Sequence, residues 1–413
     1  MQSRPLHVSV VHPTGNQNVR ELLRALVEDR SLSTFYTTVG RISPLLSPPW
    51  PASIARIANK RVYDMLSPSQ LKTVRTREIV RNMVRRVPLR RIRKLTELGG
   101  PLDALWVSRQ LGRAVVRDIH PETNILYGYL GYSAELFDGI QDEGVIRVLE
   151  AHHVTMRRLI EVTRRERERS PEWAPTLRLD DLDLTSSHGD ADIARSDVIV
   201  SPSAQVSESV LEVRPDVRIL QIPYGCPEVR MTETPRNWDG RGKLKVLFVG
   251  RLQAIKGLAD VARLHSDLSR NIEMTIVGHP LSIECRPLER LLADATYLGV
   301  LPRGRVLELM SQHHVLVLPS LVEGRSLTVL EALSVGLPAI VTPGTGTEDI
   351  VREGGGIVIP TAMSESLTYA VQSILDDPAC IQRMSVMAIE SARRYSWATY
   401  RTSVMQALHS VVA

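Results

Sequence analysis

The stretch Val315-Leu-Val-Leu-Pro-Ser-Leu-Val-Glu-Gly-Arg-Ser-Leu-Thr-Val-Leu-Glu-Ala-Leu-Ser-Val-Gly-Leu-Pro338 decides the fold of this chain. It opens with a short apolar run, 315–319, which is typical of a strand buried in a parallel sheet. Ser326 then predicts the N-cap of a helix. The apolar face of that helix is formed by Leu327, Leu330, Ala332 and Leu333. A glycine and a proline at 336 and 338 end the helix, and 338–342 provides the next strand. The stretch therefore predicts a β-α-β unit of an open α/β sheet.

Two carboxylates lie in this unit, eight residues apart. Glu323 falls in the loop at the carboxyl end of the first strand, and Glu331 falls on the helix that follows. Open α/β sheets bind their ligands at this edge. A carboxylate there can accept hydrogen bonds from vicinal hydroxyls, which both a ribose and a hexose offer. The spacing alone favours an ordinary β-α-β unit with two solvated glutamates, and the flanking Gly-Leu-Pro, 336–338, shifts the preference to a sugar-nucleotide site.

A second strand-to-helix connection carries two cations. An apolar strand, 244–249, ends at Gly250 and is followed by Arg251-Leu-Gln-Ala-Ile-Lys-Gly257, after which a helix is expected. Anions bind near helix N-termini, which places Arg251 and Lys256 where an anion is expected. A nucleoside diphosphate leaving group develops negative charge as its bond to the sugar breaks. Two fixed cations can stabilise that charge without a metal.

These motifs resemble those of the retaining glycosyltransferases of family four, which have the GT-B fold, two Rossmann-like domains facing across a cleft. In that family the first glutamate contacts the transferred sugar, the second contacts the nucleotide ribose, and the arginine and lysine contact the diphosphate. The resemblance implies these roles for Glu323, Glu331, Arg251 and Lys256. It also implies backbone contacts to the donor from Gly324, Arg325, Ser326 and Leu327.

The chain departs from the family pattern at Arg325 and Ser326. The family usually has an aromatic or small residue there, followed by glycine. This departure bears on the identity of the sugar more than on the reaction.

The N-terminal half also predicts an α/β sheet. A first strand, 7–12, precedes a loop with Gly15 and Asn16, and a helix follows. The resemblance implies a substrate loop here, with a plain turn as the alternative. The loop is not a G-x-G-x-x-G fingerprint, so a nicotinamide enzyme gains no support.

A later strand of this half, 145–150, is followed by Ala151-His152-His153. Related glycosyltransferases often have a histidine at the end of this strand, facing the donor sugar. The resemblance implies that role for His152 or His153. Neighbouring side chains diverge in an extended segment, so we expect only one of them to face the cleft. The alternative is a histidine that stabilises the sheet.

At 413 residues the chain exceeds the size of a single core, roughly 250–300 residues. We expect a Rossmann-like acceptor domain over 1–225, a linker over 226–242 and a Rossmann-like donor domain over 243–385. Final helices, 386–413, are expected to cross back to the first domain. Three widely spaced cysteines and no apolar run of ~20 residues favour a cytoplasmic protein with reduced thiols.

No metal and no cofactor are expected, because the nucleotide sugar is itself a substrate. Asp181-Leu-Asp183 has the spacing of a metal-binding Asp-x-Asp motif. It follows a charged helix, however, and no strand precedes it.

The segment 72–94 is strongly basic, with ten Lys and Arg residues and one acid, Glu78. Placed on a helix, its apolar residues share one face, and Arg77, Arg81 and Arg85 lie opposite. Such a helix suits an anionic membrane at the inner face, an acidic acceptor or a partner helix. A solvated basic face is the plain alternative. Nucleic acid is disfavoured, because the segment lacks interleaved aromatic residues.

Three functional classes remain. The first is a retaining, metal-independent glycosyltransferase, of the kind that serves polysaccharide biosynthesis, acting on a glycan, a lipid-linked molecule or a small molecule. The second is a nucleotide-sugar epimerase on a similar fold. The third is a non-catalytic sugar-nucleotide-binding or membrane-binding protein. The two-glutamate motif and the two cations favour the first.

Overall fold

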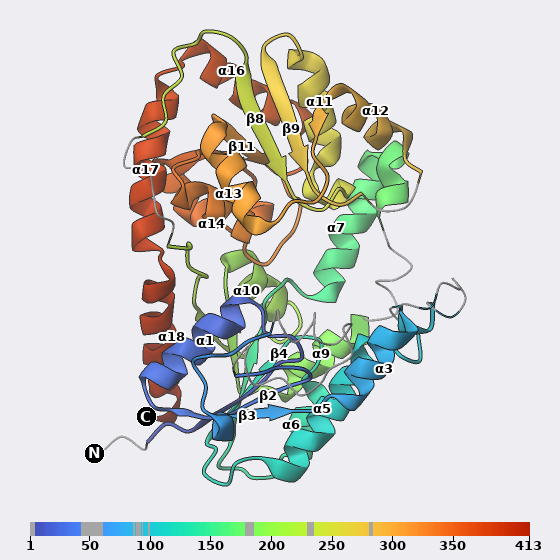
Figure 1. Ribbon diagram of the computed structural model, residues 1–413, viewed down its shortest axis with the longest axis vertical. Coiled ribbons are helices and arrows are strands. Elements are labelled where there is room, and N and C mark those ends of the chain that lie inside the picture. Colours follow the sequence, from blue (N-terminus) through green and yellow to red (C-terminus); the bar gives the residue numbers. More distant parts are fainter. Residues whose placement is uncertain are drawn as a thin grey trace.

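The computed structural model describes residues 5–42, 61–85, 87, 92, 94–97, 100–177, 186–228, 235–280 and 284–413. Two lobes, each built on one parallel sheet, lie one above the other (Figure 1). The Asp181-Leu-Asp183 motif and residues 229–234 of the expected linker lie outside the described residues.

The first lobe holds a seven-stranded sheet in the order β3-β2-β1-β4-β5-β6-β7. Every pairing in it is parallel. Its central strands are fully buried apolar runs, as expected where helices cover both faces of a sheet. The strands are β1 Val8–Val11, β2 Leu32–Thr37, β3 Leu71–Thr73, β4 Ile125–Tyr129, β5 Ile146–Glu150, β6 Val198–Ser201 and β7 Arg218–Gln221.

The second lobe repeats this arrangement with six strands, in the order β10-β9-β8-β11-β12-β13. These pairings are also parallel. Both sheets therefore have the doubly wound order 3-2-1-4-5-6, in which a ligand crevice opens where the order reverses. The strands are β8 Leu244–Val249, β9 Ile272–Val277, β10 Thr296–Tyr297, β11 Val315–Leu318, β12 Ala339–Val341 and β13 Gly356–Val358.

Helices cover both sheets. Those of the first lobe are α1 Gln17–Glu28, α3 Thr76–Val84, α5 Ala104–Asp118, α6 Ala134–Gly139, α7 Met156–Arg169, α9 Ser186–Arg195 and α10 Ala204–Leu211. Those of the second are α11 Leu258–Leu268, α12 Arg286–Asp294, α13 Arg303–Gln312, α14 Leu327–Ser334, α15 Glu348–Ile350 and α16 Ser364–Asp376. Within the described ranges, no helix combines the length and the apolar character that a membrane crossing requires.

The last two helices run along one side of both lobes (Figure 1). α17, Cys380–Arg394, packs on α14 of the second lobe, and α18, Trp397–Val412, packs on α1 of the first. Arg401 of α18 forms an ion pair of 2.8 Å with Glu21 of α1, whose side chain is almost fully buried. Where the chain passes between the lobes, Cys226 donates its backbone N–H to the carbonyl oxygen of Tyr395. The two places where the chain passes from one lobe to the other, near Cys226 and near Tyr395, therefore lie side by side.

The basic segment differs from the single amphipathic helix expected from the sequence. Lys72 belongs to strand β3, and the helix of this region, α3, extends only from Thr76 to Val84. Residues 86, 88–91 and 93 lie outside the described part. The expected orientation is also wrong. Arg77 and Arg81 are half-buried against the protein, whereas Val80 and Met83 are 37% and 56% exposed.

The reason for this orientation is polar packing. The Arg77 guanidinium lies 4.8 Å from the ring centre of Trp106 and donates to the Trp106 carbonyl oxygen. Glu78, the only acid of the segment, is buried and accepts from Arg61. These contacts turn the charged face inward, and a rule based on apolar periodicity does not include them.

Candidate active site

The carboxyl ends of β8 and β11 carry the donor-side residues. These two strands are neighbours at the point where the strand order of the second sheet reverses. Arg251 follows β8 and is exposed, and Lys256 ends a short 3₁₀ turn, Ala254–Lys256, before α11. Glu323 follows β11. The fold thus brings together at one edge the three residues that two separate motifs predicted.

Lys256 and Glu323 form an ion pair. The Lys256 Nζ lies 2.9 Å from Glu323 Oε2, and the two side chains are only 19% and 14% exposed. The second carboxylate oxygen, Oε1, accepts a hydrogen bond of 2.6 Å from the Ser320 hydroxyl. Both oxygens of Glu323 are therefore engaged within the protein.

The backbone of the Glu323–Gly324 loop is hydrogen-bonded to side chains of the first lobe. The Ser203 hydroxyl donates to the Gly324 carbonyl oxygen at 2.6 Å, and the Gln205 amide donates to the Glu323 carbonyl oxygen at 3.0 Å. A Cβ added at Gly324 would lie 1.9 Å from the carbonyl oxygen of His152. Only glycine allows the end of β5 to approach this closely.

The two histidines after β5 differ in the charged groups that act on them. The pKa of His153 is lowered to about 4. Burial is the largest cause, and the positive charges of Lys256 and Arg251 also disfavour the protonated ring. His152 has its pKa lowered to about 4 by burial and by His153. His152 in turn acts on a third histidine, His12. The donor-side cations therefore act on His153, whereas His152 acts on His12, and which ring faces the cleft stays a prediction.

His12 was not predicted as a site residue. It follows β1, is 4% exposed, and its ring packs edge-on against Tyr129. Its Nδ1 accepts the backbone N–H groups of Thr14 and Gly15, at 3.0 and 2.8 Å. Burial first, and then His152 and Arg61, lower its pKa to about 3. Because Nδ1 is an acceptor, the neutral ring must carry its proton on Nε2.

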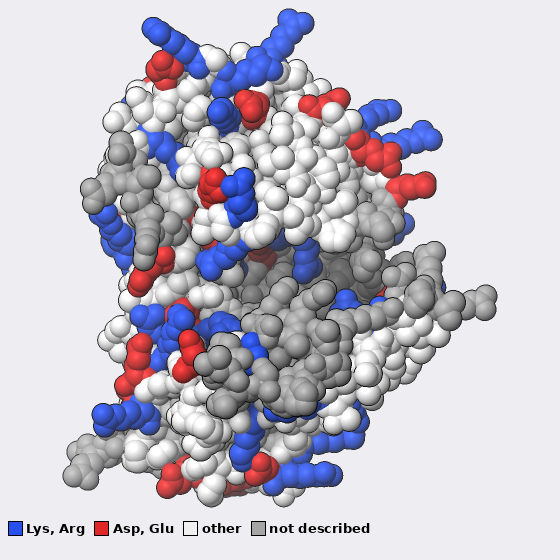
Figure 2. Space-filling view, in the orientation of Figure 1, with Lys and Arg blue, Asp and Glu red and all other residues white. Residues whose placement is uncertain are grey.

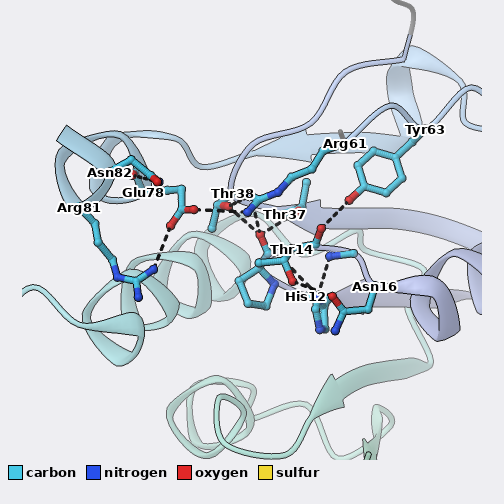
Figure 3. A network of polar contacts seen from close by, with 12 residues as sticks. His12, Thr14, Asn16, Thr37, Thr38, Arg61, Tyr63, Glu78, Arg81 and Asn82 are labelled. Atoms are coloured by element: carbon cyan, nitrogen blue, oxygen red, sulfur yellow. Dashed lines mark hydrogen bonds and ion pairs between the residues drawn. The ribbon is translucent and has the colours of Figure 1, made fainter. Parts of the chain in front are cut away.

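The expected substrate loop is shaped by this histidine (Figure 3). Gly15 has a left-handed backbone with φ of 66°, and a Cβ there would lie 2.0 Å from the Tyr63 hydroxyl. Asn16 is exposed, and its side chain accepts from the Thr14 hydroxyl at 3.3 Å. The loop is thus a fixed structure that requires glycine at 15.

Glu331 lies on α14, and its partner is Arg303 at the start of α13. The Arg303 Nε is 2.5 Å from Glu331 Oε1, and the Glu331 side chain is 17% exposed. Arg303 is half exposed, so it can move away from the carboxylate when another donor arrives. No feature of the sequence indicated this pair.

The departure from the family pattern has a structural explanation. The Arg325 side chain is 1% exposed and forms an ion pair with Asp349 at 2.9 Å. It also donates to the Gly346 carbonyl oxygen and lies over the Tyr395 ring. Arg325 therefore points into its own lobe, at the position where the family pattern has an aromatic or small residue.

The expected backbone contacts to the donor differ in availability. The Ser326 N–H donates to the Thr345 carbonyl oxygen at 2.9 Å, so this group is already engaged. Ser326 is the N-cap residue of α14, but its side chain makes no capping hydrogen bond. Leu327 is 39% exposed, unlike Leu330 and Leu333, and so does not belong to the buried face expected for it.

No group of three or more His, Cys, Asp or Glu side chains placed to hold a metal occurs among the described residues. Metal independence remains a prediction.

Comparison with known proteins agrees with this geometry. Residues 233–395 match the family model described as glycosyl transferases group 1. The C-terminal part of this chain is therefore similar to the glycosyltransferases of group 1. The matched range contains Arg251, Lys256, Glu323 and Glu331.

Two curated relatives are similar over part of their length. A glycogen synthase of Mycobacterium tuberculosis (strain H37Rv) is 28% identical over 225 residues, which cover 52% of this chain and 54% of the relative. A D-inositol 3-phosphate glycosyltransferase of Corynebacterium glutamicum (strain R) is 30% identical over 183 residues, 41% of this chain and 44% of the relative. The chain spans about half the length of the curated relatives it matches.

Solved structures match over nearly the whole chain. Sucrose-phosphate synthase from Thermosynechococcus elongatus has a TM-score of 0.67 at 18% identity and covers 98% of this chain and 99% of its own. A UDP-forming trehalose-phosphate synthase from Burkholderia xenovorans has a TM-score of 0.62 at 14% identity and covers 99% and 100%. The GT-B fold predicted from the sequence is confirmed.

The histidine pKa values give a testable prediction. We expect His12, His152 and His153 to remain neutral down to pH 5, because all three pKa values lie well below 6.5. The unfolded chain binds these protons with a pKa near 6.5, so the three histidines should reduce stability as the pH falls from about 6.5 to about 4. Long-range ¹H–¹⁵N NMR of the imidazoles measures this directly. An imidazole midpoint above pH 5.5, or a proton on His12 Nδ1, would contradict the assignment.

Proposed function

We propose that this protein is a retaining glycosyltransferase that moves a sugar from a nucleotide-sugar donor to an acceptor without a divalent metal. The observation that carries the proposal is the Lys256–Glu323 ion pair at the reversal point of the second sheet, where Arg251 follows strand β8. The similarity to the glycosyltransferases of group 1 supports the reaction class. A similar structure, Anabaena HepE, was solved with UDP and glucose, which supports a nucleotide-sugar donor.

The two cations supply the electrostatics of the reaction. As the glycosidic bond breaks, negative charge grows on the departing diphosphate, and Arg251 and Lys256 are placed to stabilise it. Cations fixed before the reaction need no reorganisation when that charge develops. This role is the one that a divalent ion has in other transferases, and so it supports metal independence.

The ion pair also links donor binding to release of the carboxylate. Without a donor, the Lys256 charge is balanced by Glu323. A diphosphate carries more negative charge than one carboxylate, so it competes for Lys256. Glu323 is then free to accept hydrogen bonds from the hydroxyls of the sugar. Donor binding would thus prepare the carboxylate that positions the sugar.

The first lobe provides the opposite wall. His152 and His153 approach the Glu323–Gly324 loop through their backbone, and both rings are neutral near pH 7. A neutral imidazole can donate to or accept from a sugar hydroxyl without adding charge beside the developing oxocarbenium ion. Lys256 and Arg251 lower the pKa of His153 and are not among the causes that act on His152, which supports His153 as the ring nearer to the diphosphate.

The reaction is tested by incubation with a panel of nucleotide sugars and candidate acceptors in the presence of a chelator. We expect nucleotide release that depends on an acceptor, and a product with the anomeric configuration of the donor. A strict requirement for a divalent ion would contradict metal independence. Release of an epimerised sugar without an acceptor would instead identify an epimerase, and the absence of turnover with all donors would favour a binding protein.

The two carboxylates should separate binding from turnover. Glu331→Ala should weaken the binding of a nucleoside diphosphate by about tenfold or more, because a ribose hydroxyl loses its partner, a loss of ~1–3 kcal/mol. Glu323→Ala should reduce kcat more than affinity, because its partner is the transferred sugar. Isothermal titration and initial rates measure the two effects. Equal affinity of the wild type and Glu331→Ala would refute the ribose assignment.

We also propose that this otherwise cytoplasmic enzyme makes a peripheral contact with the inner face of an anionic membrane. The residues proposed for this contact differ from those expected from the sequence. The groups that α3 presents to solvent are the apolar Val80 and Met83 with the cation Arg85, rather than Arg77 and Arg81. Apolar insertion combined with basic residues is the usual basis of such a contact.

The contact is tested by co-sedimentation with anionic and neutral liposomes. Met83→Asp should reduce binding to anionic liposomes, because it removes an inserting side chain and adds a like charge. Tyr369→Asp, which changes a residue 67% exposed on the second lobe, is the matched control and should have no effect. Equal sedimentation with both lipid types would contradict the contact.

A further inference from the structure

A row of polar groups follows the carboxyl edge of the first sheet, from His12 to α3 (Figure 3). It begins at the loop after β1, continues through Thr38 after β2 and Arg61, and ends at Glu78 and Arg81 of α3. This is the edge at which open α/β sheets bind ligands. The donor-side residues lie on the other lobe, so the row belongs to the wall that remains for the acceptor.

Arg61 is held rigidly in this row. Its Nη1 donates to the Thr38 hydroxyl at 3.0 Å and to the Pro13 carbonyl oxygen at 3.3 Å. Its Nη2 lies 3.4 Å from Glu78 Oε1, and its side chain is only 14% exposed. The charge of Arg61 also contributes to the lowered pKa of His12, after burial and His152, which places it close to that ring. Arg61 is thus a fixed cation beside the loop that the sequence predicted as a substrate loop.

Arg81 has a weak partner. Its Nη1 lies 3.9 Å from Glu78 Oε2, at the limit of an ion pair, although its side chain is only 20% exposed. The Nε of Arg81 is buried and has no hydrogen-bond partner. Burial is the main cause that lowers the pKa of Arg81, and the charge of Glu78 acts in the opposite direction. Arg85, Asp103 and Tyr132 have weaker effects on this pKa. The buried Nε of this guanidinium therefore lacks the hydrogen bond that it can donate.

Among the residues that the structure describes, the charges of this cluster do not balance. Glu78 is shared by Arg61 and Arg81, and Asp103 is already engaged as the N-cap of α5, where it accepts from the Trp106 N–H. Arg85, one turn beyond Arg81, adds a further positive charge. Figure 2 shows Lys and Arg side chains along the recess between the two lobes. A half-buried excess of positive charge at a ligand-binding edge favours an anionic ligand.

We propose that Arg61 and Arg81 form a subsite for a phosphate group on the acceptor, so that the acceptor is a phosphate monoester. The inference rests on the proposed transferase function and names the acceptor class. A phosphate monoester carries a charge of about −1.5 to −2 near pH 7 and three acceptor oxygens. Guanidinium groups engage such a group through charge-assisted hydrogen bonds. Glu78 sets the spacing of the two guanidinium groups and keeps both arginines at the edge of the sheet without a ligand.

The subsite can be tested by binding, without turnover. The probes are inorganic phosphate and glucose 6-phosphate, with glucose and glucuronate as comparisons, followed by NMR titration of the ligand. Arg81→Gln should weaken the binding of both phosphates by about tenfold, because it removes charge-assisted hydrogen bonds. Arg165→Gln, which removes an arginine 75% exposed on α7, is the charge-matched control and should change binding less than twofold.

Two further measurements distinguish a phosphate subsite from a donor-side anion site and from a purely structural role of Arg81. Arg251→Gln should leave Arg81-dependent binding of glucose 6-phosphate intact, because Arg251 belongs to the donor side. The melting temperature of Arg81→Gln without ligand should be unchanged or higher, since an incompletely paired buried cation is removed. A lower melting temperature with unchanged phosphate affinity would make Arg81 a structural residue and overturn the proposal.

Three binding results would also overturn it. These are equal phosphate affinity of the wild type and Arg81→Gln, equal affinity for glucose and glucose 6-phosphate, or binding of glucuronate as tight as that of glucose 6-phosphate. Absence of turnover with every nucleotide sugar would instead contradict the proposed function, while phosphate binding at Arg81 could still be measured. The two failures are therefore distinguishable.

Discussion

The ion pair between Lys256 and Glu323 is the interaction on which the rest of the active site depends. Two cations at the end of a strand would attract any anion, and a lone carboxylate beside them would repel it. Their pairing at 2.9 Å keeps both groups in place in the free protein, at a site where each is mostly shielded from water. A group that arrives with more charge than a carboxylate can then exchange partners with Lys256. The order in which the donor is bound and the sugar is positioned would follow from this exchange.

The backbone around this pair makes the two lobes act together. Gly324 packs on the His152 carbonyl oxygen, and Ser203 and Gln205 hold the same loop from the first lobe. A further ion pair of 2.7 Å joins Arg169 of α7 to Asp260 of α11, so the lobes are also linked at the end of α7. A shift of the first lobe therefore moves the loop that carries Glu323. The chain passes between the lobes near Cys226 and Tyr395, so a movement at these two crossings would also shift the carboxylate.

The sequence predicted those parts of the structure that are determined by residues close together in the chain. Glu323, Arg251 and Lys256 lie next to strongly apolar strands, and strand ends can be located from apolar runs bounded by glycine and proline. Strands β2, β3 and β13 were not predicted. The last two are three residues long with no fully buried position, which leaves little periodicity to detect. Strand β7 was not predicted either. Its residues are exposed or half-buried, so it lacks the apolar run of a buried strand, and its sequence is that of a segment leading into a linker.

The misses at the site have a different cause. His12 stands at a strand end, as His152 does, and the same rule could have found it. The pairing of Arg303 with Glu331, and of Arg61 and Arg81 with Glu78, depends on long-range packing that no local pattern contains. The predicted orientation of α3 failed for the same reason. Apolar periodicity assigns the charged face to solvent unless an acid and an aromatic residue elsewhere in the fold draw it inward.

The most direct test of the partner exchange is the affinity of a nucleoside diphosphate for Glu323→Gln. This substitution keeps the shape of the side chain and removes the carboxylate that competes for Lys256. Titration calorimetry should show binding tighter than that of the wild type by about fivefold, the factor that ~1 kcal/mol of ion pairing gives. Sugar transfer by the same variant should fall. Equal or weaker binding of the diphosphate would show that Lys256 does not exchange Glu323 for phosphate, and would contradict the proposed exchange.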